Sequence, residues 1–367
     1  MKFSGRATDM AKAVALAASV APQKHDKPII TNLALIAHDD YVEIMATDLK
    51  TGVRLKVTDV TINKTGSVVI NAKKAAQVFN KIGKDKVTVS LLKSGCQIAT
   101  KGYKSKLQTF NIREFPKLVE FDDDADGFSI PVSTLKSMIK KTSFAVAKIA
   151  NNYAMHGIFI ELMDDNLRFV ATDTKRLAYR QVPLEGNNED DAVIVPKDSM
   201  GVVFKSLLDG EEDVDVRIND ATICMKSDKA VISMQQLHGQ FPPYHSFVDV
   251  DFGTPVIFDR KQFIDALDKA SLFTSPNSQI VVLDFMGDGL SITAQSTEFG
   301  ESDVFIEPEE VLYEPMKMGL NPEILMDALK VMKSETFTMY VSEPVKPVLL
   351  QEPDDTYKCI VIPVLLH

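Results

Sequence analysis

The sequence predicts an α+β protein made of three repeated units, each with two helices backed by β-sheets. Two recurring patterns carry this prediction. An apolar helical stripe opens at residues 75, 200 and 325, which are evenly spaced along the chain. A pair of short strands also spans the same length three times, from Asn32 to Ala46, from Gly157 to Ala171 and from Ile280 to Ala294. A repeat of this kind indicates one supersecondary unit used three times.

The stripe predicts the second helix of each unit, because its apolar residues follow the i, i+3, i+4, i+7 spacing of one helix face. Asn71 and Asn321 are expected N-caps, and Pro196 and Pro322 suit the first helical position. The stripe consists of Ala75, Val78, Phe79 and Ile82, then Met200, Val203, Phe204 and Leu207, then Leu325, Ala328, Leu329 and Met332.

An earlier helix and a strand pair precede this stripe in each unit. Polar turns at 38–40, 164–166 and 287–289 are expected to connect the strands as hairpins. Asp48 and Asp173 follow the second strand at equivalent positions, so we interpret them as turn caps rather than catalytic carboxylates. The earlier helices are marked by Met10, Val14, Ala17 and Ala21, by Leu135, Met138, Ile139 and Thr142, and by Phe263, Leu267 and Ala270.

Two acidic, turn-rich stretches separate the repeats. They lie at 121–127 and 248–253, and each follows a Phe-Pro pair. We interpret them as solvated linkers. The predicted domains are therefore residues 1–125, 126–250 and 251–367.

Composition favours a protein of the cytoplasm without a disulfide framework. Cys96, Cys224 and Cys359 lie too far apart for a Cys-x-x-Cys site and are expected to be reduced core residues. The N-terminus lacks the apolar region of a signal peptide, and the apolar stretch 13–21 is too short to span a bilayer.

The motifs of common enzymes are missing from the sequence. It contains no P-loop, no His-Glu-x-x-His and no Gly-x-Ser-x-Gly, and its six histidines do not have the spacing of metal ligands. We therefore expect no catalytic residues, no metal and no cofactor.

Positive charge is concentrated in two helical segments. The chain has 41 Lys and Arg against 51 Asp and Glu, so a net charge of −10 gives no general reason to expect nucleic acid. Yet the segments 72–84 and 131–148 contain lysines and no acid. Either these lysines only solubilise the helices, or they form a phosphate-facing surface without base-reading residues. They are Lys73, Lys74, Lys81 and Lys84, then Lys136, Lys140, Lys141 and Lys148.

The chain resembles the bacterial sliding clamp, the β subunit of DNA polymerase III, over its whole length. The resemblance rests on the order and spacing of four stretches within the threefold repeat. These are Ala46-Thr47-Asp48-Leu49, Ala171-Thr172-Asp173-Thr174-Lys175-Arg176-Leu177-Ala178, Phe241-Pro242-Pro243-Tyr244, and Tyr357-Lys358-Cys359-Ile360-Val361-Ile362-Pro363-Val364.

This resemblance implies a head-to-tail homodimer in which six clamp-type units form a ring around duplex DNA. It implies that the ring slides without reading sequence, as a processivity factor that tethers the replicative polymerase and is placed on DNA by a clamp loader. The DNA-facing residues would be Lys24, Lys27, Lys73, Lys74, Lys136, Lys140, Lys141 and Lys148.

The resemblance also implies a groove for Gln-Leu-rich, aromatic-ended peptides and a dimer contact. The dimer contact would join Leu272 and Phe273 to Leu107 and Phe110 of the second copy. A monomeric peptide-binding scaffold that does not encircle DNA is the alternative. The groove residues would be Met155, Thr172, Thr174, Lys175, Arg176, Leu177, Pro242, Phe247, Ile360, Val361, Ile362, Pro363, Val364 and Leu366. The usual family residues are replaced at Thr174, Lys175, Ser246 and Leu365.

Overall fold

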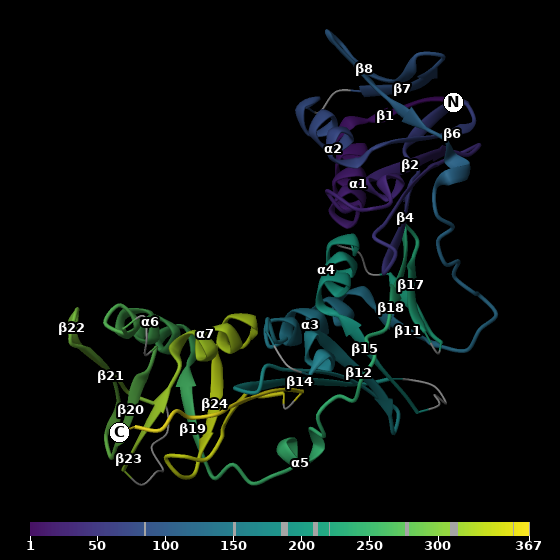
Figure 1. Cartoon of the computed structure of the whole chain (residues 1–367). Coiled ribbons are helices and arrows are strands. Elements are labelled where there is room, and N and C mark those ends of the chain that lie inside the picture. Colours follow the sequence, from purple (N-terminus) through teal and green to yellow (C-terminus); the bar gives the residue numbers. More distant parts are fainter. Residues whose placement is uncertain are drawn as a thin grey trace. The chain divides into compact units, whose positions relative to one another are not determined.

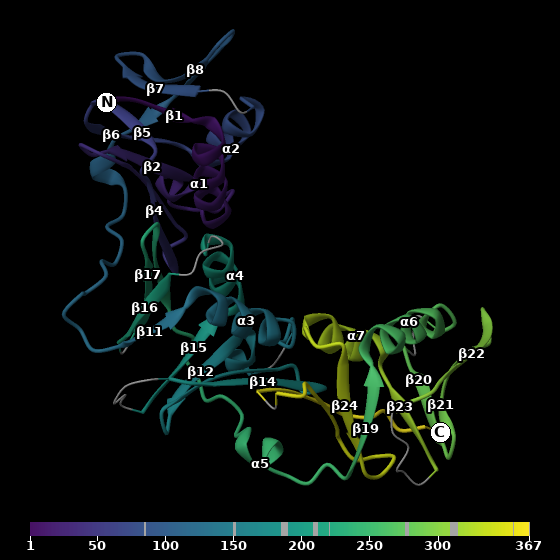
Figure 2. The ribbon, with the colours of Figure 1, turned by 180° about the vertical axis from the view of Figure 1, so that it is seen from behind.

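A computed structural model gives the fold of the chain (Figures 1 and 2). It describes residues 1–83, 86–149, 152–184, 190–207, 212–219, 221–275, 279–308, 315–354 and 356–366. The chain divides into two compact units. The first contains Met1–Lys136 and Asp198–Gln236, and the second contains Ser137–Lys197 and Leu237–His367.

The first compact unit has two antiparallel sheets, with strand orders β5-β1-β7-β8-β9 and β10-β6-β2-β3-β4-β18-β17-β16-β11. The strands are β1 (Lys2–Arg6), β2 (Asn32–Ala37), β3 (Val42–Thr47), β4 (Thr51–Val57), β5 (Val60–Lys64), β6 (Gly66–Asn71), β7 (Lys86–Leu92), β8 (Gly95–Thr100), β9 (Tyr103–Leu107), β10 (Thr109–Phe110), β11 (Phe128–Pro131), β16 (Asp213–Ile218), β17 (Thr222–Ser227) and β18 (Ala230–Gln235).

The second compact unit also has two antiparallel sheets, ordered β15-β12-β13-β14-β26-β25-β24-β19 and β22-β21-β20-β23. The strands are β12 (Gly157–Met163), β13 (Asn166–Thr172), β14 (Arg176–Pro183), β15 (Asp191–Pro196), β19 (Thr254–Asp259), β20 (Val281–Met286), β21 (Gly289–Ser296), β22 (Gly300–Ile306), β23 (Met316–Leu320), β24 (Thr336–Val341), β25 (Val348–Gln351) and β26 (Tyr357–Val361).

The helices pack their predicted apolar stripes against these sheets. Figure 1 shows α1 beside α2 and α6 beside α7, each pair within one compact unit. The α-helices are α1 (Ala7–Val20), α2 (Ala72–Lys81), α3 (Val132–Ser143), α4 (Lys197–Ser206), α5 (His245–Val248), α6 (Arg260–Ser271) and α7 (Pro322–Val331), and short 3-10 helices cover Pro28–Thr31, Ile112–Glu114 and Tyr153–His156.

The threefold repeat is confirmed by the order of the elements. Each repeat runs strand, helix, three strands, strand, helix, three strands, as in β11, α3, β12 to β15, α4, β16 to β18. The first repeat adds β5 and β10 to this plan. In the third repeat, Phe263 of α6 packs edge-on against Phe258 and Phe337, with ring centroids 5.0 and 5.2 Å apart.

Two strand ladders continue the sheets from one repeat to the next. β4 of the first repeat pairs with β18 of the second, and β14 of the second repeat pairs with β26 of the third. Each ladder lies inside one compact unit, so the compact units cut across the predicted domains. The boundaries at 125/126 and 250/251 stay a prediction.

The predicted helix caps are confirmed with one shift. Asn71 accepts a hydrogen bond from the backbone N–H of Lys74 at 3.0 Å, and Asn321 accepts from Glu323 and Ile324. α7 begins at Pro322, as expected. Pro196 instead ends β15, opposite Gly157, so α4 begins one residue later.

The turn role of Asp48 and Asp173 is confirmed. Asp48 Oδ1 accepts from the N–H groups of Lys50 and Thr51, at 2.9 and 2.6 Å, and Asp173 Oδ1 accepts from the N–H groups at 175 and 176, both at 3.1 Å. The residue after each aspartate has positive φ, +76° at Leu49 and +75° at Thr174. This left-handed conformation is unfavourable for a side chain with a Cβ, so the aspartate hydrogen bonds offset a local strain.

The three cysteines are free and buried, as the sequence predicts. Burial raises the pKa of the Cys96 thiol to about 11 and that of Cys359 to about 12. Thiols that stay protonated at neutral pH are poor nucleophiles and poor metal ligands, so these residues serve packing.

Candidate functional site

Most of the lysines predicted to face DNA are exposed. Lys73 and Lys74 lie on α2, and Lys140 lies on α3. Lys24, Lys27 and Lys148 lie in exposed loops. Lys84, from the same acid-free segment as Lys73, lies outside the described residues. The exposed ammonium groups leave this part of the chain open to an anionic partner.

Lys136 is only partly exposed. Its ammonium lies 5.6 Å from the ring centroid of Phe204, a cation–π distance. Its side chain therefore packs along the surface as well as carrying charge.

Lys141 is not part of the exposed set, which corrects the prediction for this residue. It is 4% exposed, and its ammonium donates to the carboxylate of Glu352, which is also 4% exposed. The ammonium also lies 5.2 Å from the ring centroid of Tyr357. Burial lowers the pKa of Lys141, although the contact with Glu352 acts in the opposite direction. Lys141 holds α3 to the third repeat and is removed from the DNA-facing set.

Four of the predicted groove residues lie in the β14–β26 ladder of the second compact unit. Leu177 lies opposite Ile360 and Arg176 opposite Val361. The ladder ends at Val361, and Pro363, which has no N–H group to donate, follows two residues later. The chain then crosses to the other sheet, where the N–H of Val364 donates to Gly319 at 2.8 Å.

The groove residues fall into three groups by exposure. Met155, Thr172, Ile360 and Val361 are buried and form the base. Arg176, Leu177, Pro242 and Pro363 are partly buried. The remaining members are exposed and include four large apolar side chains, Phe247 at 55%, Ile362 at 49%, Leu366 at 46% and Val364 at 39%, together with Thr174 and Lys175. These four side chains are the exposed large apolar members of the predicted groove.

Arg176, one of the predicted groove residues, is already bound by other groups of the chain. Its guanidinium donates to Asp173 at 3.0 Å, to Asp327 at 2.8 Å and to the carbonyl of Phe144 at 3.0 Å. Burial disfavours the charged guanidinium, but these carboxylates raise the pKa of Arg176 above its usual value. Arg176 therefore joins the second and third repeats beneath the groove.

A network around Glu161 fixes the short helix that carries Phe247. Tyr244 Oη donates to Glu161 Oε2 at 2.5 Å, His245 Nε2 lies 3.3 Å from Glu161 Oε1, and Arg168 donates at 3.1 Å. Burial disfavours the charged carboxylate, yet these hydrogen bonds hold the pKa of Glu161 below its ordinary value. Its contribution to stability is therefore present at neutral pH and is lost as the pH falls through this lowered pKa. This network could not be predicted from sequence spacing, because Glu161 and Tyr244 are distant in the chain.

The four residues predicted at a dimer contact are all accessible in the single chain. Leu272 is 73% exposed and Phe110 is 44% exposed, while Leu107 and Phe273 are partly buried. Leu107 ends β9, which is an edge strand of the five-stranded sheet, and β22 is an edge strand of the four-stranded sheet. The ring of Phe273 lies beside Gly300 at the start of β22.

Two kinds of feature are absent from the described residues. In this part of the chain, no helix is long and apolar enough to cross a membrane. The same residues contain no group of three or more His, Cys, Asp or Glu side chains placed to hold a metal ion.

Three models of one protein family match consecutive parts of the chain. Models of the DNA polymerase III beta subunit match at residues 1–119 for its N-terminal domain, 129–243 for its central domain and 250–364 for its C-terminal domain. The beta sliding clamp of Bacillus subtilis is 24% identical over 376 residues, covering 99% of both chains. That of Chlamydia pneumoniae is 25% identical over 372 residues, covering 100% of both.

Solved structures show the same fold. The DNA polymerase sliding clamp of Bacillus subtilis has a TM-score of 0.92 at 24% identity, with 100% of both chains covered. The sliding clamp of Pseudomonas aeruginosa bound to griselimycin has a TM-score of 0.92 at 23% identity, again with 100% of both chains covered.

The buried role of Lys141 can be tested against its exposed neighbour. Lys141→Ala leaves the Glu352 carboxylate buried without its cation, so we expect it to lower the free energy of unfolding by about 3 kcal/mol. Lys140→Ala is the matched control and should change stability by less than about 0.5 kcal/mol. Urea unfolding of both variants measures the difference, and equal stabilities would contradict the buried role.

Proposed function

The chain belongs to the DNA polymerase III beta subunit family, and on this premise we propose that it is a DNA sliding clamp that encircles duplex DNA as a head-to-tail homodimer. It is a processivity factor of the cytoplasm without catalytic activity or a cofactor of its own. It tethers the replicative polymerase and receives the clamp loader through linear peptides.

The observation that carries this proposal is the way the repeats join. At each junction, the third strand after a repeat's first helix pairs with the last strand of the next repeat, β4 with β18 and β14 with β26. The corresponding strands of the third and first repeats are β22 and β9. Both are edge strands of their sheets in the single chain. Pairing β22 with β9 of a second copy repeats the same junction and closes a ring by a heterologous contact.

The existing ladders also supply a register for this junction. Val53 lies opposite Ile232 in the β4–β18 ladder. Ser302 is the counterpart of Val53, because the two residues pair with the equivalent alanines Ala294 and Ala46. In the same way, Ser105 is the counterpart of Ile232, since they pair with Ile98 and Met225, which are equivalent in the repeat. The proposed register therefore sets Ser302 opposite Ser105.

This register matches opposite charges across the junction. Counting outward from the serine pair places Glu301 opposite Lys106 and Asp303 opposite Lys104. Alternate residues of a strand share one face, so both pairs lie on the same side of the sheet. Opposite charges directly across antiparallel strands stabilise the pairing, whereas like charges oppose it. Leu272, Phe273, Leu107 and Phe110 add apolar area beside this ladder.

The acid-free lysine segments support DNA encirclement. Lys24, Lys27, Lys73, Lys74, Lys136, Lys140 and Lys148 would face phosphates, in a chain whose net charge of −10 otherwise repels them. Lysines contact phosphates without reading bases, so binding would be independent of sequence and sensitive to salt.

The exposed apolar residues around β26 support the peptide site. Phe247, Ile362, Val364 and Leu366 would contact the leucine and aromatic side chains of a linear motif, on the base formed by Leu177 and Ile360. Thr174 and Lys175 provide polar contacts at one end. Arg176 holds this base in place from below.

Charge reversal tests the dimer junction. Lys104→Glu with Lys106→Glu should raise the dimer dissociation constant by at least about tenfold, because each of the two junctions then opposes like charges. Glu301→Lys with Asp303→Lys should do the same. A chain that carries all four substitutions, or a mixture of the two double variants, should form dimers again. Sedimentation measures the mass, and Lys93→Glu is the control. A parent protein that stays at 40.6 kDa would favour the monomeric scaffold.

Retention on DNA tests encirclement. Protein loaded by a clamp loader should stay on circular duplex and leave after the circle is cut. Replacement of Lys73, Lys74 and Lys140 by glutamate should lower retention for every sequence tested, because phosphate contacts are lost. Lys93→Glu again serves as the control. Equal retention on circular and linear DNA would contradict encirclement.

Peptide affinity tests the groove. Phe247→Ala and Leu366→Ala should each lower the affinity for a Gln-Leu-x-Leu-Phe peptide by about tenfold, since each removes an exposed apolar contact. Val345→Ala is the matched control, because Val345 is 60% exposed in the same compact unit and lies outside the predicted groove. Calorimetric titration gives the affinities. Unchanged affinity in both groove variants would remove these residues from the site.

A further inference from the structure

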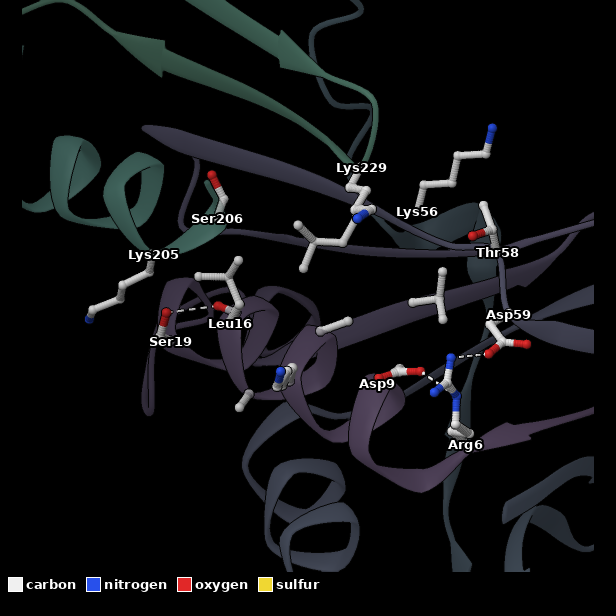
Figure 3. A pocket seen from close by; sticks show the side chains of 15 residues that line it. Arg6, Asp9, Leu16, Ser19, Lys56, Thr58, Asp59, Lys205, Ser206 and Lys229 are labelled. Carbon is white, nitrogen blue, oxygen red and sulfur yellow. Dashed lines mark hydrogen bonds and ion pairs between the residues drawn. The ribbon is translucent and has the colours of Figure 1, made fainter. Parts of the chain in front are cut away.

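A cavity of about 690 Å³ lies in the first compact unit, outside every residue set considered above (Figure 3). One wall is the exposed face of α1, another is the end of β4 and the turn that follows it, and the third comes from Lys205, Ser206 and Lys229 of the second repeat. Its volume lies in the range of small-molecule sites, which is roughly 300 to 1,000 Å³.

The cavity is cationic in an acidic protein. Five basic residues line it against two acids, Asp9 and Asp59. Arg6 engages both acids, with its Nε 3.2 Å from Asp9 Oδ2 and its other end donating to Asp59. Figure 3 shows this cluster at one end of the cavity. Arg6 offsets one of the two negative charges, and the four lysines of the lining outweigh the other, so the cavity has a net positive charge.

The lysines are distributed along the cavity. Lys205 lies at the end away from Arg6, and Lys229 lies between them above α1 (Figure 3). Lys12 stands on α1 itself. Within the described residues, neither Lys12 nor Lys229 has an ion-pair partner. The ammonium of Lys56 lies 4.7 Å from the ring centroid of Tyr41, so Lys56 belongs to the rim.

The site is built on fixed backbone. The N–H of Lys56 donates to the carbonyl of Lys229 at 2.8 Å, which ties the β17–β18 turn to β4. The lining also contains apolar side chains, Ala13 and Leu16 of α1 and Leu55 and Val57 of β4. A ligand that fits this lining has negative charge at one part and an apolar body at another.

We propose that this cavity binds a phosphate-bearing ligand of nucleotide size, with its phosphates at Lys12 and Lys229 and its apolar body against Leu16 and Leu55. The same chemistry is offered by a free nucleotide and by one segment of a DNA strand. The inference does not require ring closure, because the whole cavity belongs to one compact unit of one chain.

Calorimetric titration of the intact protein tests the proposal, with dATP, inorganic tripolyphosphate and a hexathymidylate as probes. We expect dATP to bind with one site per chain, more tightly than tripolyphosphate and more weakly as salt rises. Lys12→Glu with Lys229→Glu should lower the affinity for dATP by at least about tenfold. Lys93→Glu, which reverses an exposed lysine outside the cavity, should leave the affinity unchanged.

A second variant keeps the test independent of the lysines. Leu16→Ser trims the apolar wall, so it should reduce the advantage of dATP over tripolyphosphate while tripolyphosphate binding stays the same. Binding of dATP without the hexathymidylate assigns the site to free nucleotides, and tighter binding of the hexathymidylate assigns it to a DNA strand. No binding of any probe, or equal affinity in the double lysine variant, overturns the proposal. Dimer mass and DNA retention are measured separately, so a failure here leaves the clamp function untouched.

Discussion

The structure depends on backbone hydrogen bonds that join the edge strand of one repeat to the edge strand of the next. The β4–β18 and β14–β26 ladders extend sheets across the repeats, so the strands at these junctions gain partners that the isolated repeats lack. Unpaired strand edges expose donors and acceptors to other chains. Pairing within the chain satisfies these groups at the two junctions and leaves β22 of the third repeat and β9 of the first repeat as edge strands.

Much of the fold could be predicted because its signals are local. The helical stripes follow from spacing within two turns, and the roles of Asn71, Asn321, Asp48 and Asp173 follow from residues two or three positions away. The spacing predicts Pro196 as the first residue of a helix, whereas the helix begins one residue later, because pairing with Gly157 extends β15 to Pro196. The junction ladders could not be predicted from spacing, since their strands are distant in the sequence.

Sequence spacing is equally limited in predicting the roles of the charged residues in the candidate site. Exposed lysines such as Lys73 and Lys140 were identified by the absence of neighbouring acids. Lys141 has the same local appearance, yet it is bound by Glu352 of the third repeat. Arg176 has a nearby acid in the sequence, Asp173, but it is also bound by Asp327 of the third repeat. Contacts with residues that are distant in the sequence therefore determine whether a basic side chain is available to a ligand or holds the fold together. The buried Lys141–Glu352 pair is costly to break from one side, so this one contact ties the second and third repeats together.

The segment 362–364 is hydrogen-bonded at two points and thereby couples the two sheets of the second compact unit. Ile362 donates its N–H to Lys175 at the end of β14, and Val364 donates to Gly319 in β23, so three residues join the two sheets of the second compact unit. The side chains of this segment form part of the proposed peptide surface. A ligand that holds Ile362 and Val364 in place also holds these two hydrogen bonds, and it thereby slows local opening at the ends of β14 and β23. Binding of a partner at this segment would therefore slow amide hydrogen exchange in strands that the partner does not contact.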